Sequence, residues 1–407
     1  MYVKSLSLRQ FRTYSRLEID LPAASILLLG ANAQGKTSLL EAIAFLSLGA
    51  SPLTSTDRQV IHWAATESGM PYAHLQAEIV RGGETETLTI ALERRTLANG
   101  QERLEKRFRI GQRNVRRAEF TGRLNVVLFL PQDLSLVYGP PAERRRYLNG
   151  LLAQAHPTYA EVHTIYSQAM ARRNALLRHL RDHGGDPRQL IPYEERLVRA
   201  GVTISLYRKR LIEAMEPTID RLHRELTGDE AWLRLEYRPN LDEVHQFENS
   251  QGEALSASAT DIEALYEAYR QRLLETRPRE IARGVTLVGP HRDEVRFISN
   301  GRDLGIYGSR GQQRTAVLAL HLAELAWLQQ ITGESPVLLL DEVLAELDHA
   351  RRSYLLRALQ DIEQTILATT DVELVPHSYR DQATIFSVSA GLIQRISPED
   401  DPTGNGA

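Results

Sequence analysis

The chain contains no cysteine among its 407 residues, so it has no means of forming a disulfide framework or a cysteine-ligated metal site. No apolar run approaches the roughly 20 residues that a membrane-spanning helix needs. The first residues alternate like a strand and lack the apolar centre of a signal peptide. Lysine is scarce: Lys4, Lys36, Lys106 and Lys209 are the only four among 49 basic residues. We therefore expect a soluble, cytoplasmic protein without a membrane partner, in which a retained lysine marks a need that arginine does not meet.

Length and charge suggest more than one domain and an uneven surface. A chain of 407 residues with 42% hydrophobic content predicts two domains, or one domain with a large insertion. The net charge of −3 argues against a uniformly basic nucleic-acid binder. However, residues 144–210 carry thirteen Arg or Lys against five Asp or Glu, and a second basic cluster lies in residues 103–117. This segregation indicates either a polyanionic partner or solvated helix faces rich in arginine.

Residues 30–37 read Gly-Ala-Asn-Ala-Gln-Gly-Lys-Thr, the pattern G-x-x-x-x-G-K-[ST] of a phosphate-binding loop. An apolar run, 26–29, precedes the loop and a helix-like segment, 38–43, follows it, as the pattern requires. Glycines let backbone N–H groups approach a triphosphate, and the helix adds the positive end of its dipole. An ordinary glycine-containing turn is the alternative, but every fixed position matches. The predicted ATP ligands are Arg12, Gly30, Ala31, Asn32, Ala33, Gln34, Gly35, Lys36, Thr37 and Ser38, with Thr37 also on Mg²⁺.

The N-terminal third predicts a β-rich lobe around this loop. Alternating runs are separated by turns, and Gly82-Gly83 splits two of them in the manner of a hairpin. The expected strands are residues 3–8, 17–21, 26–29, 73–81, 85–93, 108–110 and 125–130.

The middle of the chain predicts a helical hairpin. Apolar residues over 142–182 recur at gaps of four and three, with Arg173 at the one missing position, and a second run covers 189–227. The turn 184–187 separates the two runs, which we expect to pack along a near-heptad stripe. Further expected features are bends or interruptions at Pro157 and Pro217, a strand over 232–237, a helix over 261–283 and a return to sheet over 286–297.

An apolar strand, 337–340, ends in the carboxylates of Asp341 and Glu342. Its uniform apolarity is typical of a central strand that is buried on both faces. Such an ending alone is weak evidence, but together with the phosphate loop it predicts Asp341 on Mg²⁺ and Glu342 polarising the attacking water. Asp341 lies 305 residues beyond Lys36, so the helical hairpin between them is interpreted as an insertion.

Residues 308–314, Gly-Ser-Arg-Gly-Gln-Gln-Arg, open a long amphipathic helix that ends near Gln330. A Ser-x-Gly-Gln loop at a helix N-terminus is a second phosphate-binding arrangement. One chain has no evident use for it beside its own loop, which favours a head-to-tail dimer in which each copy closes the other's ATP. The residues predicted to act in trans are Ser309, Gly311, Gln312 and Asp348.

These elements, in this order and with a helical insertion, resemble the ATP-binding-cassette heads of chromosome-maintenance and double-strand-break-repair proteins. Six segments together resemble the RecF family of bacterial recombination mediators more closely, and the resemblance extends to about residue 390. They are residues 10–14, 30–43, 139–148, 288–293, 308–315 and 369–371.

The resemblance implies an α/β fold with an ABC-type P-loop ATPase head in two parts, 1–130 and 285–395, an inserted, mainly helical arm, 131–284, and a disordered tail, 396–407. It implies an ATP-induced dimer that binds duplex and single-stranded DNA at gap junctions and hydrolyses ATP slowly, as a DNA-stimulated switch. It also implies work with RecO and RecR to load RecA in recombinational repair, replication and the SOS response. An ABC-type transport or translation ATPase is the alternative, against which stand the basic hairpin and the lack of a membrane-coupling sequence.

Three assignments depend on details of this sequence. Gln132 stands where members of the family often carry an acid, and it is predicted to contact Mg²⁺. The group His291-Arg292-Asp293 is either a catalytic dyad or a hydrogen-bonded structural corner, and we favour the corner. The arginines predicted to bind DNA are Arg107, Arg109, Arg113, Arg116, Arg172 and Arg178.

Overall fold

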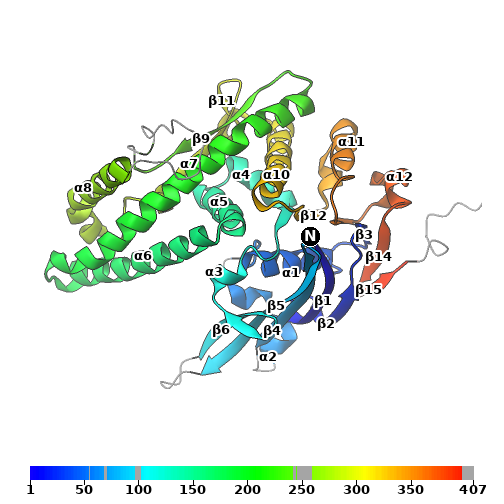
Figure 1. Cartoon of the computed structure of the whole chain (residues 1–407), viewed down its shortest axis with the longest axis horizontal. Coiled ribbons are helices and arrows are strands. Elements are labelled where there is room, and N and C mark those ends of the chain that lie inside the picture. Colours follow the sequence, from blue (N-terminus) through cyan, green and yellow to red (C-terminus); the bar gives the residue numbers. More distant parts are fainter. Residues whose placement is uncertain (55, 68–70, 97–101, 242–243, 245–258, 397–407) are drawn as a thin grey trace, which may run out of the picture. The chain divides into compact units, whose positions relative to one another are not determined.

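The computed structural model describes residues 1–54, 56–67, 71–96, 102–241, 244 and 259–396. The predicted tail therefore lies almost wholly outside the described residues. Contacts divide the chain into two compact units (Figure 1), one formed by residues 1–133 with 321–407 and the other by 134–320. We call them the nucleotide unit and the arm unit. Residues 285–320 group with the arm unit, whereas the sequence assigned them to the head.

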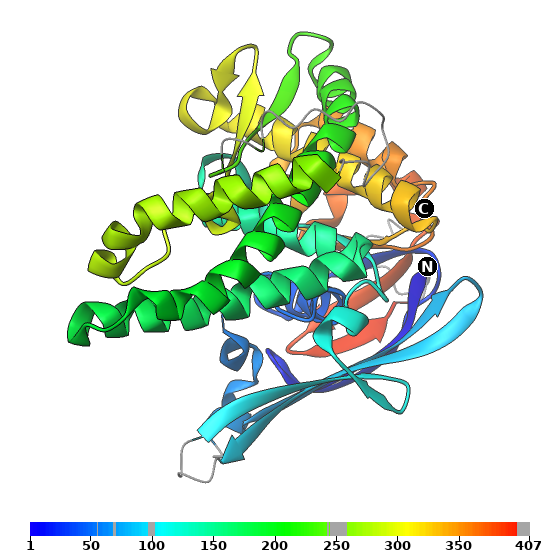
Figure 2. The same cartoon turned by 60° about the vertical axis from the view of Figure 1, so that its left-hand side comes forward.

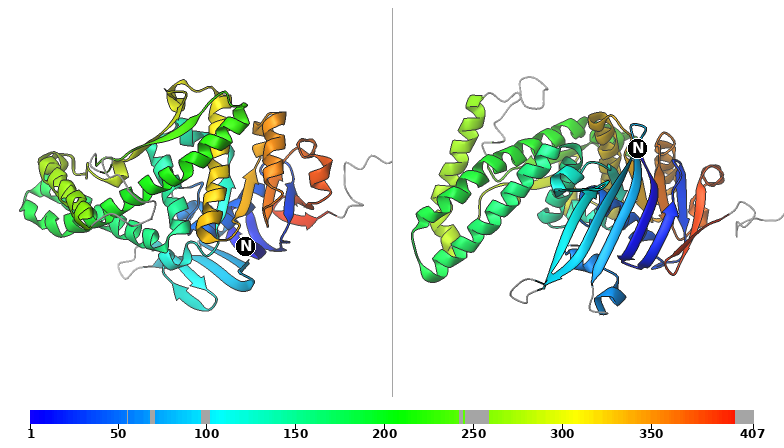
Figure 3. Two further views of the ribbon diagram at one scale, coloured as in Figure 1. Left: turned by 45° about the horizontal axis from the view of Figure 1, so that its top comes forward. Right: turned by 60° about the horizontal axis from the view of Figure 1, so that its bottom comes forward.

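An antiparallel sheet forms one layer of the nucleotide unit (Figure 3). Its expected hairpin is confirmed: Gly82 and Gly83 turn the chain at φ of 56° and 82°, in the left-handed region that glycine adopts without penalty. Along the sheet the strands are β2 (Tyr14–Asp20), β1 (Tyr2–Phe11), β4 (Tyr72–Arg81), β5 (Glu84–Thr96), β6 (Glu102–Ile110) and β7 (Arg113–Val115).

A second sheet is parallel apart from its edge strand β15. Every residue of β12 and β13 is buried, as uniform apolarity predicts for central strands. The carboxyl ends of the parallel strands meet at one edge, where open α/β sheets bind ligands. The strands in order are β15 (Leu392–Arg395), β14 (Thr384–Ser389), β3 (Ser25–Leu29), β13 (Thr365–Thr369), β12 (Val337–Asp341) and β8 (Val126–Phe129).

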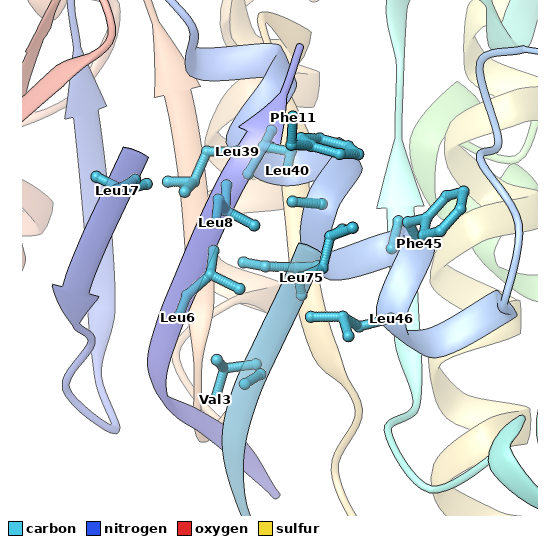
Figure 4. Packing of buried hydrophobic residues seen from close by; sticks show 14 of the residues in the cluster. Val3, Leu6, Leu8, Phe11, Leu17, Leu39, Leu40, Phe45, Leu46 and Leu75 are labelled. Carbon is cyan, nitrogen blue, oxygen red and sulfur yellow. The ribbon is translucent and has the colours of Figure 1, made fainter. Parts of the chain in front are cut away.

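Helix α1 (Lys36–Leu48) contacts strands of both sheets and is buried along most of its length. Figure 4 shows Leu39 and Phe45 of this helix among Leu8, Phe11 and Leu75 of the antiparallel sheet. Because both of its sides face apolar layers, the helix is fixed in position, and the phosphate loop at its N-terminus is fixed with it. The smaller elements of this unit include α2 (Trp63–Glu67), α3 (Arg117–Phe120), α11 (His349–Ala358) and α12 (His377–Arg380).

Long helices that pack side by side make the arm unit (Figure 2). Pro157 starts α6 after a break at His156, which confirms the expected interruption. Helix α7 runs through Pro217, so the chain is not interrupted there. The helices are α4 (Ser135–Tyr138), α5 (Pro141–Ala155), α6 (Pro157–His183), α7 (Ile191–Thr227), α8 (Ala259–Arg283) and α9 (Leu304–Tyr307), and α10 (Arg310–Thr332) continues from this unit into the other.

A small sheet in the arm unit accounts for the different grouping of residues 285–320. The expected return to sheet over 286–297 begins only at Glu294, where β10 (Glu294–Ser299) pairs with β9 (Leu233–Arg238) and β11 (Arg302–Asp303). Since β9 follows α7 directly, these pairings tie residues 294–303 to the arm.

Arg173 explains the missing position in the apolar stripe of α6. Its side chain is fully buried and donates to Glu280 of α8 at 2.6 Å and to Glu194 of α7 at 2.9 Å. Glu194 also pairs with Arg277, at 2.6 Å. The residue that interrupts the apolar pattern therefore links three helices through buried ion pairs.

Candidate nucleotide-binding site

The loop between β3 and α1 needs its glycines for two separate steric reasons. A Cβ on Gly30 would lie 2.2 Å from the carbonyl oxygen of Val388 on β14. Gly35 has a φ of +120°, and a Cβ there would lie 2.9 Å from the Tyr14 hydroxyl and 3.0 Å from Thr13 Oγ1. Only glycine allows the neighbouring backbone to approach this closely.

Two turns from other parts of the chain hold the loop in shape. The Tyr14 hydroxyl donates to the Gly35 carbonyl at 3.0 Å. In the turn between β14 and β15, the Gly391 N–H donates to the Gln34 carbonyl at 3.1 Å and the Ala390 N–H donates to Gln34 Oε1 at 2.6 Å. The phosphate loop is therefore preorganised by both sheets.

The side chain of Lys36 folds back onto the first residues of the loop. Its side chain is 4% exposed, and Nζ donates to the carbonyls of Gly30 at 2.6 Å and Ala31 at 3.1 Å. The same ammonium group forms an ion pair with Glu342 Oε1 at 3.1 Å. Glu342 Oε2 accepts from the N–H and the hydroxyl of Thr370, at 3.1 and 3.3 Å. The structure thus joins the predicted phosphate-binding lysine to the predicted water-polarising carboxylate.

Asp341 completes the group from the end of β12. The Thr37 hydroxyl donates to Asp341 Oδ2 at 2.7 Å, whereas Oδ1 is buried without a hydrogen-bond partner among the described residues. Burial, together with the charge of Glu342, raises the pKa of Asp341, although Thr37 and Lys36 act in the opposite direction. A divalent cation would supply the missing positive charge, and a hydroxyl beside a carboxylate oxygen suits Mg²⁺. The residues present therefore fit this ion.

Gln132 lies just after strand β8. This strand pairs in parallel with β12, and Phe129 near its end is the register partner of Leu340, the residue before Asp341. The Gln132 side chain is exposed at the same carboxyl edge of the sheet as Asp341. This neighbourhood is compatible with the predicted Mg²⁺ contact, which stays a prediction. Within the described part of the chain, no cluster of three or more His, Asp or Glu side chains suggests a separate metal centre.

Arg12 is hydrogen-bonded to helix α1 in this structure. Its guanidinium donates twice to Glu41, both at 2.7 Å, and once to the Gln59 carbonyl at 2.9 Å. Glu41 is 2% exposed and also accepts from Ser51. The donors of Arg12 thus satisfy a buried carboxylate, and its role as an ATP ligand stays a prediction.

The residues predicted to act in trans lie in both units. In the arm unit, the Ser309 N–H donates to Gln312 Oε1 at 2.8 Å and the Gln312 N–H donates to Ser309 Oγ at 3.3 Å. This reciprocal pair is a capping box at the start of α10, with Gly311 exposed between the two residues. In the nucleotide unit, Asp348 caps α11: the Arg351 N–H donates to its carboxylate at 2.9 Å, and this bond and the Arg351 side chain lower the Asp348 pKa.

The predicted DNA-binding arginines are not gathered in one unit. Arg107 and Arg109 lie on β6, and Arg172 and Arg178 are exposed on α6 of the arm unit. Arg107 belongs to a row of residues that crosses the sheet on one face. In this row Arg107 of β6 stands opposite Ala91 of β5, Ala91 opposite His74 of β4, and His74 opposite Arg9 of β1. Acidic residues accompany this row, since Arg107 pairs with Glu93 and Glu105 and Arg113 pairs with Glu119, while Arg116 is exposed.

The group His291-Arg292-Asp293 is a hydrogen-bonded corner of the arm unit, as predicted. His291 contacts the Tyr166 hydroxyl at 2.6 Å and the Thr286 carbonyl at 3.1 Å, and burial lowers its pKa to about 4. Asp293 is buried and accepts hydrogen bonds from Arg208, Tyr237 and Asn240.

A buried histidine that the sequence did not indicate lies close to Gln132. His321 is held between Asp133 at 3.0 Å and Glu324 at 2.9 Å, with the Phe129 ring 4.4 Å away. Burial would lower its pKa, but the two carboxylates outweigh this effect and raise the pKa to about 10. Asp133 ends the first segment of the nucleotide unit and His321 begins the second. Since 188 positions separate the two residues, no local pattern could have revealed the pair.

Comparison with known proteins supports this assembly of motifs. Residues 2–394 match the family model described as the RecF/RecN/SMC N terminal domain. The DNA replication and repair protein RecF of Chloroflexus aurantiacus is 40% identical over 381 residues, covering 91% of this chain and 94% of that protein. Its counterpart from Chloroflexus aggregans is 40% identical over 402 residues, covering 97% and 99%.

Solved structures agree with these matches. The recombination mediator protein RecF-ATP of the RecFOR pathway has a TM-score of 0.82 at 26% identity, covering 97% of this chain and 98% of that one. An Smc head bound to the C-winged helix domain of ScpA has a TM-score of 0.51 at 16% identity, covering 98% of each chain, and shows the fold alone. The predicted fold, an ABC-type ATPase head with a helical arm, is confirmed. The chain belongs to the RecF family of DNA replication and repair proteins.

Proposed function

We propose that this chain binds ATP with Mg²⁺ and uses its nucleotide state to control its grip on DNA in replication and recombinational repair. The observation that carries the proposal is the meeting of Lys36 with Glu342 and of Thr37 with Asp341 beside a preorganised phosphate loop. A related RecF has been solved with ATP, which supports the same ligand here. Membership of a DNA repair family favours this function over a transport or translation ATPase.

In the proposed mechanism, Lys36 exchanges the carbonyl oxygens of Gly30 and Ala31 for the outer phosphate oxygens of ATP. The backbone N–H groups of residues 30–38 and the N-terminus of α1 add positive potential. Bound Mg²⁺ would neutralise the developing charge of the transferred phosphoryl group. Thr37, Asp341 and Gln132 would hold that ion.

The two partners of Glu342, Lys36 and Thr370, are compatible with slow ATP hydrolysis. In this structure it is paired with Lys36 and held by Thr370. When Lys36 turns to the phosphates, the carboxylate remains aimed by Thr370 and is free to orient the attacking water. The expected activity is a weak, DNA-stimulated ATPase whose product state releases the dimer, since phosphoryl transfer depends on positioning more than on covalent chemistry.

We further propose that the ATP-bound form is a head-to-tail homodimer in which Ser309, Gly311, Gln312 and Asp348 of one copy complete the site of the other. The capping box supports this role because it fixes the loop at the N-terminus of α10 in one shape. Family membership supports work with RecR and RecO, and through them with RecA, at gaps in duplex DNA, in the cytoplasm and as part of the SOS response. Among the described helices, none is both long and apolar enough to cross a bilayer.

DNA binding with and without ATP tests this proposal. Gel shifts on duplex, single-stranded and gapped DNA should show tighter binding with ATP. The affinity should fall as salt rises, because each neutralised phosphate releases counterions. The logarithm of the binding constant should fall against the logarithm of the salt concentration with a slope of about −0.9 per phosphate contact. Lys36→Met should abolish the ATP-dependent part and leave weak residual binding. Lys4→Met, at an exposed lysine paired with Glu78, is the matched control and should behave as the unaltered protein.

Two results would count against the proposal. Equal DNA affinity with and without ATP at matched salt would remove the coupling between nucleotide and DNA. Unchanged ATP binding in Lys36→Met would remove the phosphate loop from the site.

A further inference from the structure

An exposed tryptophan, Trp63, begins the short helix α2. Its side chain is 67% exposed, and its ring stacks on His62, with ring centroids 5.8 Å apart and planes 23° apart. The other two tryptophans of the chain are sheltered, since Trp327 is 7% exposed and Trp232 is half-buried. Tryptophan is highly buried on average, so an indole displayed beside a second ring calls for an explanation.

Backbone contacts fasten this aromatic pair to the turn between β1 and β2. The Arg12 N–H donates to the Val60 carbonyl at 2.8 Å, and the His62 N–H donates to the Gln10 carbonyl at 2.9 Å. Phe11 and Ile61 form a β-bridge between these two bonds. The segment that carries His62 and Trp63 therefore runs antiparallel to the turn and is fixed to it.

The same turn contacts the phosphate loop on its other side. The Tyr14 hydroxyl donates to the Gly35 carbonyl at 3.0 Å, and Thr13 Oγ1 lies 3.0 Å from the position a Cβ on Gly35 would take. Arg12 reaches Glu41 on the helix that follows the loop. An unbroken series of contacts, all within the nucleotide unit, thus connects the phosphate loop to the exposed rings.

A nucleotide held at its phosphates extends its base beyond the loop, and an aromatic face stabilises any base by stacking. We propose that His62 and Trp63 form the platform on which the base of the bound nucleotide stacks, an inference that rests on the proposed ATP site. Because every base has a π-face, this platform supplies affinity without selecting adenine. The turn between β1 and β2 connects these rings to the phosphate loop, which favours the base of ATP over an unpaired base of DNA as the occupant.

The test measures the affinities of ATP, GTP and inorganic tripolyphosphate for Trp63→Ala, by calorimetry. Alanine should weaken ATP and GTP alike, by about 5- to 150-fold, the range expected for one base on one aromatic ring. Tripolyphosphate has no base, so its affinity should not change. Trp63→Phe keeps a ring and should restore most of the affinity. Trp232→Ala, in the arm unit, is the matched control and should bind all three ligands as the unaltered protein does.

The outcomes separate this inference from the proposed function. Unchanged ATP affinity in Trp63→Ala, with ATP binding still lost in Lys36→Met, would overturn the platform and leave the ATP site intact. Equal weakening of tripolyphosphate would also overturn it, because the effect would then come from a disturbed loop. If ATP affinity is unchanged but affinity for single-stranded DNA falls, the platform belongs to a DNA base and the inference fails. Absence of ATP binding in the unaltered protein would refute the proposed function itself.

Discussion

Replacing Arg173 with methionine should destabilise the arm unit by about 3–5 kcal/mol, the cost of breaking a buried ion pair from one side. The guanidinium is fully buried, and it donates to Glu280, Glu194 and the Thr286 hydroxyl, the last at 3.0 Å. Burial alone would lower the pKa of Arg173, but the two carboxylates outweigh it and hold the pKa above its ordinary value. Methionine fills a similar volume, so the loss comes mainly from Glu280, which is fully buried and would retain an uncompensated charge.

Urea unfolding followed by circular dichroism and by fluorescence measures this loss. Two compact units need not unfold as one transition, so the arm is followed through Trp232, which lies within it. Arg172→Met is the matched control, because this neighbouring arginine on α6 is exposed, and its removal should change the free energy of unfolding by less than about 0.5 kcal/mol.

A second replacement tests the reasoning itself. Glu280→Gln removes the charge but keeps an oxygen that can accept from the Leu287 N–H, which lies 2.6 Å from Glu280 Oε1. Combined with Arg173→Met, it should recover at least about 1 kcal/mol, because Glu194 still has Arg277 as a partner. The reasoning is refuted if the losses in the double variant simply add, or if Arg173→Met is no more harmful than Arg172→Met.

Three further predictions concern catalysis, assembly and pH. Glu342→Gln should lower ATP turnover at least ~10²-fold, the scale of a lost general base, and prolong the ATP-bound dimer; near-normal turnover in a phosphate-release assay would remove Glu342 from the mechanism. Ser309→Arg should leave ATP binding to the monomer intact and block ATP-induced dimerisation, measured by light scattering; loss of monomer binding would instead assign this loop to its own subunit's site. The His321 pKa is raised from 6.5 to about 10, so its stabilisation is complete below pH 6.5 and is lost as pH rises towards 10. Relative to His321→Gln, the unaltered protein should therefore lose about 1.4 kcal/mol of unfolding free energy per pH unit in that window, and equal pH slopes would contradict the ion pairs with Asp133 and Glu324.

The local geometry of the candidate nucleotide site was predictable because its signals are contiguous in the sequence. The phosphate loop is a contiguous pattern between a strand and a helix, and its glycine spacing is the signal of a backbone that can approach phosphates. The uniform apolarity of residues 337–340 predicted a central strand, and its ending in Asp341 and Glu342 predicted their place at the carboxyl edge. The hairpin at Gly82-Gly83 was likewise predictable, since turn chemistry involves only neighbouring residues.

Contacts between distant segments decided the rest. Arg173 interrupts an apolar stripe, and its sequence neighbourhood gives no sign of the carboxylates on α7 and α8 that neutralise it. The His321 pKa is raised in part by Asp133, 188 positions away, and Trp63 is connected to the phosphate loop because strand β1 pairs with the segment before α2. Periodicity and motifs report on neighbours within a few residues, so the sequence by itself determined the elements and the chemistry of the loop. Burial of charge and the pairing of remote strands depend on the folded chain, so only the tertiary structure decided which side chains meet.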